Sequence, residues 1–116
     1  MTPAEITFKE NLEKIKAFGV SLMQLKNELS EKLNNSILLS VGTTDNKLFI
    51  YAGWKDGHVD LFEIRLNIQD LEIDKFTVYP NKQPIIGYNE VKSILFSESI
   101  RHGLYSIQRA MLHLEL

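Results

Sequence analysis

Cysteine is absent from the 116-residue sequence. Its absence excludes disulfide bonds, thiolate nucleophiles, iron–sulfur clusters and zinc sites with cysteine ligands. Long apolar runs are absent as well, since no stretch approaches the ~20 residues of a membrane-spanning helix. The N-terminus lacks the apolar segment of a signal peptide, because Glu5, Lys9 and Glu10 interrupt it. We therefore expect a cytoplasmic protein that does not associate with a membrane.

The sequence also lacks an excess of either charge. Thirteen Lys and Arg residues stand against fifteen Asp and Glu residues, for a formal net charge of −2. The basic residues form no stripe along any segment, so binding to nucleic acid is not indicated. A hydrophobic fraction of 44% is that of an ordinary globular chain. At this length we expect one domain over residues 1–116.

Motifs that carry chemistry are equally scarce. The six glycines are scattered and form no phosphate-binding loop, and no Gly-x-Ser-x-Gly elbow marks a hydrolase nucleophile. The three histidines, His58, His102 and His113, do not stand at spacings that pair them on one metal ion. We predict no catalytic residue, no cofactor and no metal ligand, and we favour a protein that is not an enzyme.

Residues 3–34 are predicted to form one long amphipathic helix. Thr2, Pro3 and Glu5 fit a capping box at its start, and the polar run Asn34-Asn35-Ser36 ends it. An apolar stripe runs along the helix with a spacing of seven residues: Phe8, Ile15, Leu22 and Leu29. Further apolar residues widen it: Leu12, Phe18, Leu25 and Leu33.

Such a helix is long for so small a domain. Its length is ~48 Å at ~1.5 Å per residue, whereas a domain of this size is only about 26–30 Å across. The helix must overhang its own sheet, bend, or break, and Gly19 is the candidate for a bend or a break. An overhanging stripe needs a partner, so we predict a homodimer that forms through Phe8, Ile15, Leu22 and Leu29. The alternative is a helix that breaks near Gly19 and folds back.

Residues 37–79 are predicted to form a four-stranded, mostly antiparallel meander. The strands are Ile37–Val41, Lys47–Trp54, Phe62–Ile68 and Glu72–Tyr79, with turns at 42–46, 55–58 and 69–70. In the second strand Phe49 and Tyr51 are apolar on the opposite face from Leu48 and Ile50. Both faces of that strand should therefore be covered, by this chain or by a partner.

Residues 88–116 are predicted to form one or two helices packed on the sheet, and Ser97-Glu98-Ser99 offers a fresh cap for the second. One face carries an apolar stripe: Ile100, Leu104, Ile107, Met111 and Leu114. The opposite face carries His102, Tyr105 and Arg109, which could contact an anion or a partner. The alternative interpretation is an ordinary solvated face.

The densest acidic cluster surrounds the Asp56-Gly57 turn and comprises Asp56, His58, Asp60 and Glu63. Carboxylates and an imidazole could hold a divalent cation there. The alternative function is therefore a small metal-dependent hydrolase or nuclease. The string Glu63-Ile64-Arg65 departs from the Glu-x-Lys pattern of restriction-type nucleases, because arginine stands where that pattern has lysine.

Residues 48–57, LFIYAGWKDG, resemble the central hairpin of the small XisI-type element-excision factors. The resemblance depends mainly on Gly53-Trp54, and the long terminal helices depart from that family. It implies no activity for this chain.

The fold class that we predict is α+β, a single α-β(4)-α domain. The function that we favour is a small protein-binding module, such as an adaptor, chaperone, inhibitor or immunity-type protein, because apolar surface is in surplus on the first helix and second strand. Trp54 could alternatively line a small-ligand site between sheet and helices. The partner-binding candidates are Phe8, Ile15, Leu22, Leu29, Trp54, His102, Tyr105 and Arg109.

Overall fold

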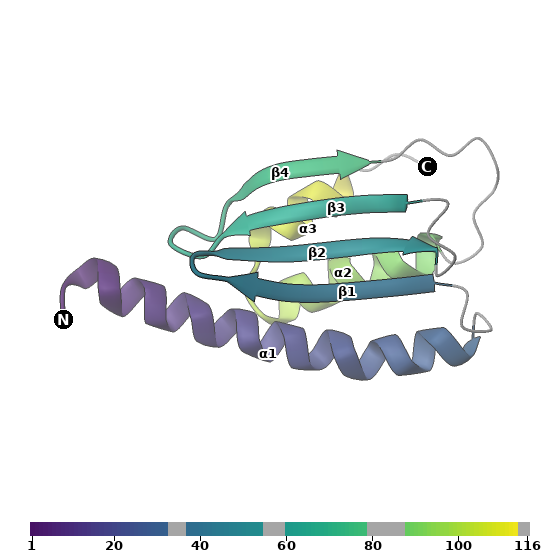
Figure 1. Ribbon diagram of the computed structural model, residues 1–116, viewed down its shortest axis with the longest axis horizontal. Coiled ribbons are helices and arrows are strands. Elements are labelled where there is room, and N and C mark those ends of the chain that lie inside the picture. The colour runs from purple at the N-terminus through teal and green to yellow at the C-terminus, as the bar shows by residue number, and fades with distance from the viewer. Residues whose placement is uncertain (33–36, 55–59, 79–87, 114–116) are drawn as a thin grey trace.

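The spacing of apolar residues changes along the chain between about 3.6 residues, which is typical of a helix, and about two residues, which is typical of a strand. Helices and strands form in the corresponding segments. A computed structural model describes residues 1–32, 37–54, 60–78 and 88–113 (Figure 1). Its elements are α1 (Pro3–Lys32), β1 (Ile37–Thr44), β2 (Lys47–Trp54), β3 (Asp60–Asn67), β4 (Ile73–Val78), α2 (Tyr88–Arg101) and α3 (Tyr105–Leu112). The predicted α+β class, with a long first helix, four antiparallel strands and C-terminal helices, is confirmed.

The first helix is continuous through Gly19. Thr2 caps it as predicted, since the backbone N–H of Glu5 donates to the Thr2 hydroxyl at 3.2 Å. Thirty residues give a rod of about 45 Å, and the longest dimension of the molecule is 49 Å. The N-terminal end of α1 therefore projects beyond the sheet (Figure 1). Asn11 anchors this part, because its Nδ2 donates to the carbonyls of Ile68 and Gln69 at 2.8 and 3.0 Å.

The four strands pair in sequence order, and every pair is antiparallel. The first strand is longer than the sequence predicted and continues to Thr44, which pairs with Lys47. Only Asp45 and Asn46 form the turn, and Asp45 adopts a φ of 37°, a conformation that Asp tolerates in tight hairpins. Because a two-residue turn suffices, Gly42, Thr43 and Thr44 join the strand.

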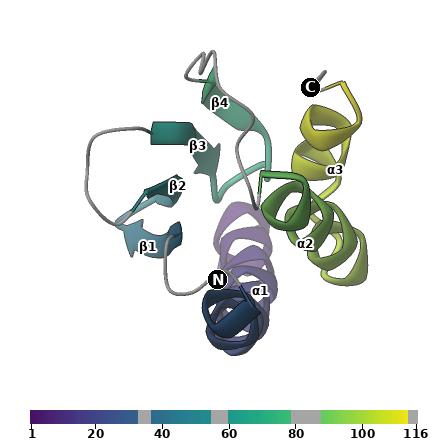
Figure 2. The same ribbon diagram turned by 90° about the vertical axis from the view of Figure 1, so that its right-hand side faces the viewer.

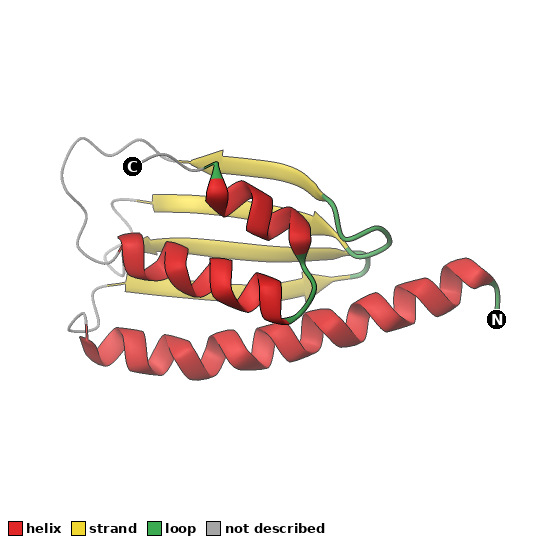
Figure 3. Ribbon diagram, turned by 180° about the vertical axis from the view of Figure 1, so that it is seen from behind, coloured by secondary structure: helices red, strands yellow, loops and turns green. Residues whose placement is uncertain are grey.

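All three helices cover the same face of the sheet (Figures 2 and 3). The core lies between them and the strands. It contains Ile15, Phe18 and Leu22 from α1, Leu39, Leu48, Ile50, Ile64 and Leu66 from the sheet, and Val91, Leu95, Ile107 and Met111 from the C-terminal helices. No helix in the described part of the chain covers the opposite face, and Phe49 is 39% exposed there.

The C-terminal helices separate at Gly103, five residues later than the predicted cap, so the prediction of a boundary at Ser97-Glu98-Ser99 is wrong. These three residues lie inside α2. Gly103 adopts a φ of 75°, which glycine tolerates without a Cβ penalty. The Gly103 N–H donates to the Ile100 carbonyl, and the Leu104 N–H donates to the Ser99 carbonyl. This pair of bonds is a Schellman motif, and it ends α2 because it satisfies the last carbonyls of the helix.

Candidate functional site

The heptad stripe of α1 faces the interior of its own chain. Ile15, Leu22 and Leu29 are 2%, 0% and 6% exposed, and Phe8 is partly buried against the same core. Because α1 lies along its own sheet, these side chains stabilise the fold of a single copy. Ile15, Leu22 and Leu29 present almost no surface to a second copy, whereas Phe8 is only partly buried, and the predicted homodimer stays a prediction.

His102 lies between helices, away from the exposed face that the sequence suggested. Its Nε2 is 3.0 Å from the Ser21 hydroxyl of α1 and 3.2 Å from Oε2 of the buried Glu98 of α2. The ring also meets Phe18 edge to face, with centroids 6.2 Å apart. A proton relay needs the serine and the carboxylate at opposite ring nitrogens. Here both lie at Nε2, so the trio is a polar bridge between α1 and α2 and lacks the geometry of a catalytic triad.

Tyr105 and Arg109 lie one turn apart on α3, and the break at Gly103 separates them from His102. Tyr105 is exposed, and Arg109 pairs with Glu72 just before β4, at 3.1 Å. An exposed ion pair of this kind contributes little to stability. The three residues therefore do not form one surface, although Tyr105 remains accessible.

Several candidates fall outside the described residues. Asp56 and His58 belong to the undescribed range 55–59, and for Trp54 and Asp60 the structure describes the backbone alone. Within the described ranges, no three His, Asp or Glu residues gather to hold a metal ion. The alternative of a metal-dependent hydrolase is thus not tested by this structure.

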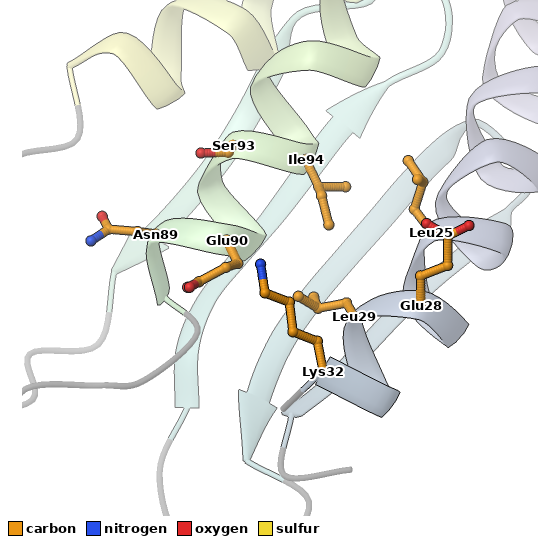
Figure 4. Close-up of a pocket in the computed structure, with 8 residues that line it drawn as sticks. All are labelled: Leu25, Glu28, Leu29, Lys32, Asn89, Glu90, Ser93 and Ile94. Atoms are coloured by element: carbon orange, nitrogen blue, oxygen red, sulfur yellow. The ribbon is translucent and has the colours of Figure 1, made fainter. Parts of the chain in front are cut away.

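A pocket of 480 Å³ opens between α1 and α2 (Figure 4). Leu25, Leu29 and Ile94 form its apolar part, whereas Glu28 and Lys32 stand at its rim. Residues 33–36 follow α1 and residues 79–87 precede α2, and both ranges lie outside the described residues. We assign no ligand to this pocket.

A larger groove of 640 Å³ lies between α1 and the edge strand β1. Val20 and Met23 line it from α1 and are 61% and 49% exposed. A Cβ at Gly19 would meet no atom within 4 Å, so the groove is open there. Val41 and Thr43 line it from β1. The sequence did not lead us to this surface, because Val20 and Met23 lie off the heptad stripe. The signal that could have identified it is the position of both residues close to Gly19 in the helix.

The two edges of the sheet differ beside this groove. The sequence of β1, ILLSVGTT, contains no charge and no proline over eight residues, and its pairing with β2 has no irregularity. The β4 edge is guarded by a bulge, since Arg65 pairs with Lys75 and Leu66 with Ile73, which leaves Asp74 as the extra residue. Charges and bulges are the usual protection of an exposed edge. Within the described ranges, the β4 edge is protected and the β1 edge is open.

The uncovered face of the sheet carries aromatic and charged side chains. Tyr51 lies over Gly53, where an added methyl group would stand 2.5 Å from its hydroxyl oxygen. Asp74 pairs with Lys47 at 2.5 Å and with Arg65 at 2.6 Å. The hydrogen bond from Lys47, followed by that from Arg65, lowers the pKa of the Asp74 carboxyl.

No described helix is both long and apolar enough to cross a lipid bilayer. No known protein family, no curated protein and no solved structure matches this chain. The resemblance of residues 48–57 to element-excision factors therefore gains no support from these comparisons.

Proposed function

We propose that this protein is a small binding module that docks another protein in the groove between α1 and β1. The observation that carries the proposal is the coincidence of two exposed features. An apolar patch, Val20 and Met23, stands directly beside the unprotected edge of the sheet. Apolar patches on the surface of a small protein commonly mark interaction sites.

The energetics favour a protein partner. Burying one side chain the size of Val or Met contributes roughly 1.5–3 kcal/mol, so Val20 and Met23 together supply an anchor of useful strength. In the described part of the chain, the groove walls carry a single charge, Lys16. Few charges in the middle of a binding patch are typical of protein interfaces. Adaptor, chaperone, inhibitor and immunity-type roles all use such a surface.

Self-association stays a separate prediction. The stripe of Ile15, Leu22 and Leu29 is buried in the core, so a homodimer would form through another exposed surface. Light scattering at several concentrations measures it directly. A mass near 13.4 kDa at all concentrations would contradict the homodimer and leave the groove free for a different protein.

The test of the docking proposal compares two variants used as immobilised baits. Val20→Asp combined with Met23→Asp places two charges in the groove at exposed positions. Ile100→Asp is the matched control, because Ile100 is also an exposed apolar residue, 42% accessible, on a different helix. We expect captured proteins that bind wild type and the control and are lost with the double variant. Equal capture by all three baits would contradict the proposal, provided that circular dichroism shows all three folded.

A further inference from the structure

The register of β1 decides which backbone groups face the groove. Thr44 and Lys47 form the hydrogen-bonded pair that closes the two-residue turn, so bonded and non-bonded pairs alternate from there. Leu39, Val41 and Thr43 fall on the non-bonded positions, and their N–H and C=O groups point away from β2. The edge therefore offers a regular ladder to one further strand.

The first helix covers the place that this strand would take. In Figure 1 α1 runs alongside β1, beyond the edge of the sheet, and Figure 2 places it in the layer of the helices. A fifth strand beside β1 would thus lie under α1, with every second side chain directed toward Gly19, Val20 and Met23. The open space at Gly19 accepts such a side chain.

A second copy of this chain would bring a helix of its own to this edge. Two copies joined through β1 would be related by a two-fold axis perpendicular to the sheet. Each α1 extends past its own β1 on the same side of the sheet (Figure 2). The axis would therefore place both α1 helices in one layer beside the joined strands. A single extended segment adds a strand to the edge without adding a second helix to that layer.

We infer that the partner of this protein enters the groove as a single extended segment, which pairs with β1 as a fifth strand beneath α1. This inference rests on the proposed function and specifies its geometry. The occupant is about eight residues long, the length of β1, with apolar side chains at alternate positions. The side chains directed to Val20 and Met23 are uncharged, since both residues are apolar.

Charge complementarity predicts one further property of the bound segment. Among the residues that the structure describes, Lys16 is the only charged one that lines the groove. Because α1 and β1 run in opposite directions (Figure 1), Lys16 lies toward the Thr43 end. A segment that runs antiparallel to β1 begins at that end. We therefore expect an acidic residue near the N-terminus of the bound segment.

In the experiment, random octapeptides displayed on phage are selected for binding to the wild-type protein. Peptides that also bind the Gly19→Leu variant are removed. Leucine at position 19 fills the groove, and it suits a helix better than glycine, so the fold persists. Gly19→Ala is the matched control, because its single methyl group meets nothing. We expect enriched peptides with alternating apolar residues and an acidic N-terminal position.

A synthetic peptide of the enriched sequence is then titrated into ¹⁵N-labelled protein. We expect the amides of Leu39, Val41 and Thr43 to become protected from hydrogen exchange. Binding should weaken by about 10-fold or more in Gly19→Leu, which is ~1.4 kcal/mol, and by less than about 2-fold in Gly19→Ala. Lys16→Glu should weaken it and should reverse the preference for an acidic residue.

Two results would overturn the inference. If selected peptides depend on Val20 and Met23 but leave the β1 amides unprotected, the groove binds a partner that is not a strand, and the proposed function stands without this geometry. If the same three amides become protected with rising protein concentration and no peptide, a second copy occupies the edge. Equal capture by all three baits in the bait experiment would instead refute the proposed function itself.

Discussion

The sheet has one guarded edge and one open edge. At the β4 edge, Asp74 forms a bulge and pairs with Lys47 and Arg65, while Ser106 of α3 donates to the Leu71 carbonyl at 2.7 Å and fastens the turn before the strand. At the β1 edge the backbone is regular and uncharged, and an apolar groove adjoins it. Evolution protects edges that must not pair. The difference teaches that, in the described part of the chain, one edge of the sheet is protected against further pairing and the other is accessible to it.

The largest effect should come from the inner face of β1. Leu39 is buried in the core although its strand is an edge, so Leu39→Ala should lower the free energy of unfolding by about 2–5 kcal/mol. Urea denaturation measures the change. Ser40→Ala, on the exposed face of the same strand, should change it by less than about 0.5 kcal/mol. Equal changes in the free energy of unfolding for the two variants would mean that contacts with the core do not hold β1 in place. The open edge would then be a frayed strand.

A smaller effect on stability should come from loss of the hydrogen bond that joins Ser106 to the turn before β4. Ser106 is buried and its hydroxyl satisfies the Leu71 carbonyl. Ser106→Ala removes the donor and should lower the free energy of unfolding by about 1–3 kcal/mol, because the partly buried Leu71 carbonyl loses this bond. Hydrogen exchange should accelerate at the β3–β4 turn and remain unchanged along β1. Acceleration at both edges would show that the two edges are not independent.

The smallest effect should come from the charge at the β4 bulge. Lys47 and then Arg65 hold the pKa of the Asp74 carboxyl below its ordinary value. The ion pairs of Asp74 therefore contribute their full stability when the pH is above that ordinary pKa. This stability is lost as the pH falls through the lowered pKa. The difference in stability between wild type and Asp74→Asn should be constant near neutral pH and shrink below about pH 4. Glu72→Gln, whose carboxylate pairs with Arg109, is an exposed control. A difference that grows in acid would contradict the assigned sign.

Local signals were sufficient for most of the elements. The capping residues Thr2 and Glu5 locate the start of α1, and the apolar run between the turns at 42–46 and 55–58 predicts β2 to the residue, from Lys47 to Trp54. Where two local signals competed, the prediction failed. Serine and glutamate at 97–99 fit a cap, yet they continue α2, because Gly103 satisfies the helix end better. The turn after Val41 was predicted too long for the same reason, since Gly42 is as compatible with a strand as with a turn.

The candidate site was less predictable than the fold. The heptad spacing of Ile15, Leu22 and Leu29 predicts an apolar stripe, but spacing does not say whether the stripe meets another helix or the chain's own sheet. His102 shows the same limit, since its partner Ser21 lies eighty-one residues away in the sequence. Val20 and Met23 look ordinary along the chain, and only their position beside β1 makes them a candidate surface.

The sequence by itself determined the order and kind of the elements, because caps, turns and hydrophobic periods act over a few residues. Only the tertiary structure decided which face of α1 is buried, which sheet edge is open, and that a groove lies between them. Those features depend on the packing of α1 against strands far along the chain. The side chains that compete for each face come from different segments, so no local pattern contains the outcome.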